Sequence, residues 1–119
     1  MLAISPDSIY AHKIEGQYSP NVHRVPFPVL ADRTHTVSRI YGVFNPQDGT
    51  DFRGTFFIDP DGILRGYFIY NGSVGRSTEE LLRALQAFQY VAATGRHTQA
   101  GWYPGLAALP PSWAHVGEY

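Results

Sequence analysis

The sequence predicts an α/β fold whose sheet carries an antiparallel edge. Two short apolar runs, residues 2–4 and 27–30, are typical of strands buried in a parallel sheet. Two further runs, residues 55–58 and 63–70, flank a tight turn and predict a hairpin. Helical patterns separate these runs, so the expected order is strand, helix, strand, helix, hairpin, helix.

The first helix is expected to start with Ser5 as its N-cap and Pro6 in its first turn, because both residue types favour those positions. Gly16 is expected to end it, since glycine is the common residue after a helix. A right-handed crossover through this helix would make the first two strands parallel neighbours.

A short second helix is expected from Thr34 or His35 to Tyr41, with Gly42 at its end. Residues 45–51 are rich in turn-forming types, so they are expected to be a link without regular structure. This link would lead directly into the hairpin.

The last helix has the clearest start signal, because Ser77 and Glu80 have the spacing of a capping box. Gly95 is expected to end the helix. Four apolar residues at helical spacing predict its packed face: Leu81, Leu85, Phe88 and Ala92. The tail, residues 96–119, is expected to be an irregular arm that packs both Trp102 and Trp113, since exposed tryptophan is unfavourable.

Composition limits the possible functions. The chain has 119 residues, 44% of them hydrophobic and 16% charged, which indicates one soluble globular domain. A net charge of −1 gives no reason to expect a nucleic-acid or membrane partner. No apolar run approaches the ~20 residues of a membrane span, so a cytoplasmic location is predicted. The chain has no cysteine, which excludes a disulfide, a zinc-thiolate site and a thiol nucleophile within it.

Histidine, serine and glycine patterns predict no catalytic, metal or cofactor site. The G-x-S-x-G, G-x-G-x-x-G and Walker patterns are missing, and a Ser–His–Asp trio cannot be chosen by spacing alone. No two histidines have the spacing of a helical zinc site; the five are His12, His23, His35, His97 and His115.

Two arginines are candidates for a functional or a structural role. Arg53 lies where a loop enters a strand, so it would be able to stabilise an anion. The alternative for Arg53 is an ion pair with Asp48 or Asp51. Arg76 precedes the N-cap Ser77, where a cation opposes the helix dipole, so it is expected to have an acidic partner.

Several motifs, in one order, resemble those of the two-cysteine peroxiredoxins of the alkyl-hydroperoxide-reductase type. The resemblance covers nearly the whole chain up to about Gly105. The matching stretches are A-I-S-P-D-S with a following His at residues 3–12, F-P-V-L-A-D at 27–32, Y-G-V at 41–43, F-R-G-T-F-F-I-D-P-D-G at 52–62, V-G-R-S with the helix after it at 74–89, and A-G-W-x-P-G at 100–105.

The resemblance implies a thioredoxin-like fold that is incomplete. In this family the peroxidatic cysteine lies upstream of the strand that begins here near Met1, so the N-terminal strands and the active-site helix are expected to be missing. The resolving cysteine of the family corresponds to Thr98. Arg53 aligns with the arginine that orients the peroxide and the thiolate, and Arg76 with the second arginine of the active-site network.

The resemblance also implies a function, the thiol-dependent reduction of hydrogen peroxide and alkyl hydroperoxides with a thioredoxin-type reductant. Without a cysteine, the isolated chain is expected to be inactive and to need a partner fragment or a homo-oligomer. A non-catalytic binding or chaperone subunit that assembles with an intact peroxiredoxin is the alternative. The expected domain organisation is a partial peroxiredoxin domain, residues 1–105, and a C-terminal tail, residues 106–119.

Overall fold

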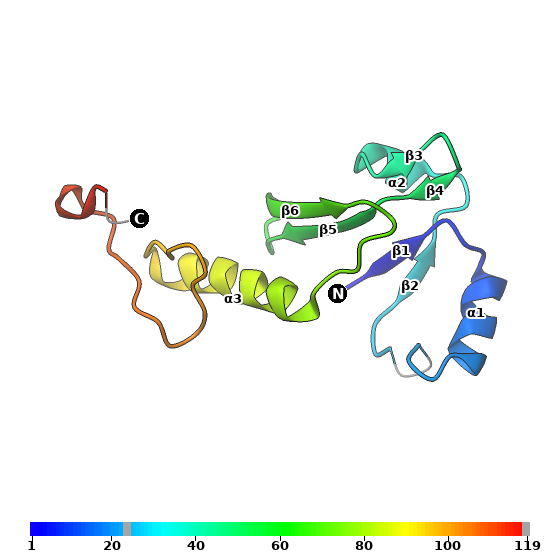
Figure 1. Ribbon diagram of the computed structural model, residues 1–119, viewed down its shortest axis with the longest axis horizontal. Helices are drawn as coiled ribbons and strands as arrows, with labels where there is room; N and C mark the ends of the chain where they lie inside the picture. Colours follow the sequence, from blue (N-terminus) through cyan, green and yellow to red (C-terminus); the bar gives the residue numbers. More distant parts are fainter. Residues whose placement is uncertain (23–24, 118–119) are drawn as a thin grey trace. The chain divides into compact units, whose positions relative to one another are not determined.

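The computed structural model describes residues 1–22 and 25–117 (Figure 1). His23 lies outside the described residues. The chain divides into two compact units, and each is considered by itself. The first contains residues 1–55 and 68–74, and the second contains residues 56–67 and 75–119.

The first unit begins with a parallel pair of strands joined through a helix. Strand β1 (Ala3–Ser5) leads into helix α1 (Ile9–Tyr18), and strand β2 (Val29–Ala31) follows. The strands pair in parallel, with Ile4 opposite Leu30. The predicted parallel neighbours are therefore confirmed. The predicted burial of these two runs is wrong, because Ile4 is 42% exposed and Leu30 is 45% exposed.

Both predicted ends of helix α1 are wrong. Ser8, not Ser5, is the N-cap, because its hydroxyl accepts a hydrogen bond of 3.1 Å from the Ala11 N–H. Gly16 lies inside the helix, which continues to Tyr18. A single glycine weakens a helix interior by about 1 kcal/mol but does not stop it when the backbone hydrogen bonds continue.

The rest of the first unit is a short helix followed by a small hairpin. Helix α2 (Thr36–Ile40) lies within its predicted range, and Gly42 after it has the expected positive φ of 69°. Residues 45–51 were expected to lack regular structure, and this is wrong. Strand β3 (Phe44–Asn45) pairs antiparallel with strand β4 (Thr50–Asp51). Gly49 supplies the positive φ of 73° in the turn between them.

The predicted larger hairpin is confirmed. Strands β5 (Arg53–Ile58) and β6 (Leu64–Tyr70) are neighbours in a two-stranded sheet. The turn between them is closed by the Asp59 N–H, which donates to the Ile63 carbonyl at 3.0 Å. A connection this short permits only antiparallel pairing.

Helix α3 (Thr78–Thr94) is the long helix of the second unit, and its predicted ends are confirmed. The Ser77 hydroxyl accepts from the Glu80 N–H at 3.2 Å, and Gly95 ends the helix with a φ of 65°. Phe88 packs against Phe57 of β5, with their ring centroids 5.1 Å apart. The predicted apolar stripe is only partly covered, because Leu85 is 41% exposed whereas Ala84 is buried.

The two tryptophans of the tail differ in burial. Trp102 is 2% exposed, its ring centroid lies 4.8 Å from that of Tyr90, and its Nε1–H donates to the Leu106 carbonyl. Trp113, in a 3₁₀ helix (Trp113–His115), is 92% exposed. The expected packing of both tryptophans is therefore right for Trp102 and wrong for Trp113.

Candidate functional site

Arg53 is the first residue of β5, and its side chain is held from one side. Its Nε–H donates to the Gly72 carbonyl at 2.7 Å. The arginine side chain is otherwise exposed. Because guanidinium donors form a rigid fork, fixing Nε also limits the directions in which Nη1 and Nη2 can point. The residue is thus a partly oriented cation that faces solvent.

The alternative prediction for Arg53, an ion pair with Asp48 or Asp51, is wrong for the described residues. Asp48 instead accepts from the backbone N–H and the hydroxyl of Thr50, at 2.9 and 2.7 Å. Asp51 accepts from the Ser38 hydroxyl at 2.7 Å. Both carboxylates are therefore engaged by nearby polar groups, and Arg53 is held by a carbonyl.

Arg76 and Thr98 both belong to the second unit. Arg76 is exposed and directly precedes Ser77, the N-cap of α3. Thr98 is half-buried and lies next to His97, which exchanges backbone hydrogen bonds of 2.9 and 3.1 Å with Leu109. The segment that would carry the resolving thiol in the resembled family is thus held in an ordered loop and carries a hydroxyl there.

A buried polar cluster in the first unit was missed by the sequence reasoning. The Ser38 hydroxyl lies 2.9 Å from Asp32 Oδ2 and 2.7 Å from Asp51 Oδ2. Ser38 is 2% exposed and Asp32 is 7% exposed. The N–H groups of Thr36 and Ser38 also donate to the Asp32 carboxylate, at 3.0 and 2.8 Å. Asp32 therefore fixes the start of α2 and joins it to β4.

These contacts favour the charged form of Asp32. The hydrogen bond from the Ser38 backbone N–H is the main cause that holds the pKa of Asp32 below its usual value, and burial opposes it. No spacing rule identifies this cluster, because Asp51 comes from a hairpin that the sequence did not predict. The cluster organises the fold and carries no reactive group.

A second polar cluster contains a serine, a histidine and an aspartate, but it is not a catalytic triad. The Ser5 hydroxyl donates to Asp7 Oδ2 at 2.8 Å and lies 2.7 Å from His12 Nε2. In a triad the histidine bridges the serine and the carboxylate. Here the serine bridges, so its hydrogen goes to Asp7 and His12 Nε2 must donate. His12 therefore cannot take the proton of Ser5.

An ion pair ties the start of α3 to the tail. Arg83 Nε and Nη2 donate to the two carboxylate oxygens of Glu80 at 2.7 and 2.8 Å, and Nη1 donates to the Trp102 carbonyl at 2.7 Å. The hydrogen bond between them lowers the pKa of Glu80 and raises that of Arg83. All the donor directions used are occupied by protein, so this arginine has a structural role.

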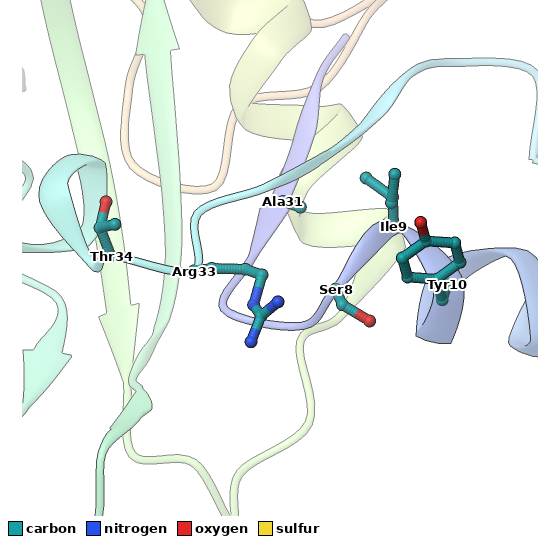
Figure 2. Close-up of a pocket in the computed structure, with 6 residues that line it drawn as sticks. All are labelled: Ser8, Ile9, Tyr10, Ala31, Arg33 and Thr34. Carbon is teal, nitrogen blue, oxygen red and sulfur yellow. The ribbon is translucent and has the colours of Figure 1, made fainter.

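A shallow hollow of about 370 Å³ lies where β1 and β2 end and α1 begins. Figure 2 shows Arg33 on one side of it and the first residues of α1 on the other. Its lining is Ser8, Ile9, Tyr10, Ala31, Arg33 and Thr34. Most of the lining is apolar, and neither Arg53 nor Arg76 takes part in it.

Two further classes of site were searched for in residues 1–22 and 25–117. No three His, Asp or Glu side chains in these ranges gather closely enough to hold a metal ion. None of the helices in the same ranges has the length and hydropathy that a membrane crossing requires.

Known proteins share this sequence and this arrangement. Residues 1–67 match the AhpC/TSA family. The selenocysteine-containing peroxiredoxin PrxU of Peptoclostridium acidaminophilum is 41% identical, over 99% of this chain and 61% of that protein. The peroxiredoxin prdx-2 of Caenorhabditis elegans is 42% identical, over all of this chain and 61% of that protein.

Solved structures give the same result. The reduced 2-Cys peroxiredoxin of Plasmodium vivax has a TM-score of 0.90 and 29% identity, and the match covers 99% of this chain and 62% of that one. AhpC of Enterococcus faecalis has a TM-score of 0.77 and 33% identity, over 82% of this chain and 59% of that one. The chain thus spans about three-fifths of the length of these proteins and has their thioredoxin-like fold.

Proposed function

Because this chain belongs to the AhpC/TSA family, we propose that it forms the cysteine-free part of a peroxiredoxin, whose reactive sulfur or selenium comes from polypeptide outside these 119 residues. The reaction is the reduction of hydrogen peroxide and alkyl hydroperoxides. The observation that carries the proposal is Arg53, a guanidinium fixed through Nε and open to solvent at its other end.

The proposed reaction requires a nucleophile that this chain lacks. A thiolate attacks one oxygen of the hydroperoxide, so that an S–O bond forms as the O–O bond breaks. The sulfur loses two electrons and becomes a sulfenic acid, and the leaving alkoxide takes up a proton to become an alcohol, or water in the case of hydrogen peroxide. A dithiol of the thioredoxin type then returns two electrons and is oxidised to a disulfide.

Arg53 would act on charge in this reaction. A nearby cation stabilises the thiolate, and the same donors stabilise the negative charge that develops on the departing oxygen. Arg76, at the start of α3, is proposed as the second cation of this network. Thr98 has no thiol, so a resolving cysteine would also have to come from elsewhere, or the dithiol would reduce the sulfenic acid directly.

Peroxide consumption tests the proposal. The purified chain alone, supplied with thioredoxin, its reductase and NADPH, is expected to consume no hydroperoxide. The same chain mixed with the part of PrxU outside the matched region, with cysteine in place of any selenocysteine, is expected to consume it. Catalytic turnover by the chain alone would contradict the proposal.

A second candidate function is a non-catalytic subunit that assembles with an intact peroxiredoxin. The observation that favours it is the total absence of cysteine. Mixing the chain with a full-length peroxiredoxin distinguishes the two candidates. The non-catalytic subunit predicts mixed oligomers with unchanged turnover per cysteine, whereas the first proposal predicts turnover without a full-length partner.

A further inference from the structure

The parallel pair β1–β2 has two different faces, and the strand register identifies them. Side chains alternate along a strand, and residues paired in register share a face. Ser5 is paired with Ala31, and Ile4 is paired with Leu30. Ser5 and Ala31 therefore lie on one face of the pair, and Ile4 and Leu30 lie on the other.

Helix α1 covers the face of Ser5 and Ala31. The Ser5 hydroxyl lies 2.7 Å from His12 Nε2 on this helix. Ala31 lines the hollow of Figure 2 together with Ile9, from the first turn of α1. Both residues are half-buried as a result.

The opposite face is apolar and uncovered among the described residues. Ile4 is 42% exposed and Leu30 is 45% exposed, and Leu2, next to the strand, is 62% exposed. Parallel sheets occur almost only where both faces are covered. A two-stranded parallel pair with one bare apolar face is therefore an unfinished layer.

The edges of the pair are open as well. Among the described residues, this sheet contains no strand besides β1 and β2. The Ala3 N–H donates to the Pro28 carbonyl, and the Asp32 N–H donates to the Ser5 carbonyl. The peptide groups of Ile4, between these two bonds, thus point away from β2. An unpaired edge of this kind is a template for another strand.

We propose that the face formed by Ile4 and Leu30 binds the segment of a peroxiredoxin chain that has no counterpart in these 119 residues. The inference rests on the proposed function. The length of the relatives identifies the occupant, because the chain matches 62% of the P. vivax peroxiredoxin with a TM-score of 0.90. More than a third of that protein remains to cover the bare face, and PrxU has a similar excess.

A binding experiment with a matched pair of variants tests the surface. The full chain is titrated with the part of PrxU outside the matched region, and complex formation is followed by sedimentation velocity. Ile4→Glu is expected to weaken binding at least about tenfold, because docking would bury the new carboxylate. Ile14→Glu makes the same change on α1, at a side chain that is 58% exposed, and is expected to change binding less than about twofold.

Two further measurements separate a surface effect from loss of folding. Both substituted side chains are partly exposed, so the far-UV circular dichroism of each variant is expected to equal that of the parent. Leu30→Glu is expected to reproduce the effect of Ile4→Glu from the neighbouring strand. Hydrogen exchange at the Ile4 amide is expected to slow in the complex.

Three outcomes would overturn the inference. These are no complex, a complex that tolerates both Ile4→Glu and Leu30→Glu, or self-association of the chain that Ile4→Glu abolishes, which would make a second copy the occupant. Failure of the proposed function has a different signature. A complex that depends on Ile4 but consumes no hydroperoxide keeps the docking surface and rejects the reaction.

Discussion

The Arg53 side chain and the Gly72 carbonyl are joined by a hydrogen bond of 2.7 Å that links the start of β5 to the turn after β6. The bond uses Nε, which leaves the two terminal nitrogens for an anion. Because the anchor is a backbone carbonyl, it does not depend on the side chain at position 72. The orientation of Arg53 is thus built into the hairpin.

Replacing Arg53 by lysine tests this orientation. Lysine keeps the positive charge but loses the planar fork that contacts the carbonyl and an anion together. Peroxide turnover by the chain complemented with the PrxU segment is expected to fall at least about tenfold, the size of one charged hydrogen bond. Arg65→Lys is the control, because Arg65 forms an exposed pair with Asp59 at 2.7 Å. Equal turnover of the two variants would count against the role of Arg53.

Asp32 is expected to make folding depend on acid. Its pKa is lowered in the folded chain, chiefly by the Ser38 backbone N–H, so its contribution is complete above its unfolded pKa. That contribution is lost as pH falls through the lower, folded value. Urea unfolding between pH 7 and pH 2 is expected to show this loss.

Asp32→Asn is the informative variant for that measurement. It is expected to be less stable at pH 7 and to depend less on pH below about 4, because the amide does not titrate and has one acceptor oxygen in place of two. Asp61→Asn, in the exposed turn after β5, is the control for loss of a single charge. The prediction fails if Asp32→Asn has the same acid dependence as the parent chain.

Gly66 on β6 is expected to tolerate no side chain. A Cβ atom there would lie 2.6 Å from Phe88 Cζ, and the Phe88 ring also packs on Phe57. Gly66→Ala is expected to lower the free energy of unfolding by about 1–3 kcal/mol, as overpacking does. Gly75→Ala, where nothing lies within 4 Å of the new Cβ, is expected to change it by less than about 0.5 kcal/mol. Similar urea midpoints for the two variants would show that Phe88 moves freely.

The two tryptophans offer the same substitution in opposite environments. Trp102→Ala is expected to cost about 3–5 kcal/mol, because it removes a ring that is 2% exposed and the donor to Leu106. Trp113→Ala is expected to cost less than about 0.5 kcal/mol, because that ring is 92% exposed. Denaturant unfolding of both variants, followed by circular dichroism, checks the difference. A large loss for Trp113→Ala would mean that this ring is covered in solution.

Local signals in the sequence determined much of the secondary structure. The cap at Ser77, the turn at residues 59–62 and the end at Gly95 were predicted because neighbouring residues alone satisfy the backbone there. The first helix was misplaced at both ends because Ser5 and Ser8 are equally good caps by type. Only the contacts of Ser5 with Asp7 and His12 leave Ser8 as the cap.

The sequence by itself determined the order of the elements, the family motifs and the absence of a thiol. Tertiary structure alone decided that Asp32 and Asp51 meet at Ser38, that Arg53 binds a carbonyl and not a carboxylate, and that Ile4 and Leu30 share a bare face. The physical reason is that these relations join segments far apart in the chain. Residue type and spacing describe only what near neighbours can do.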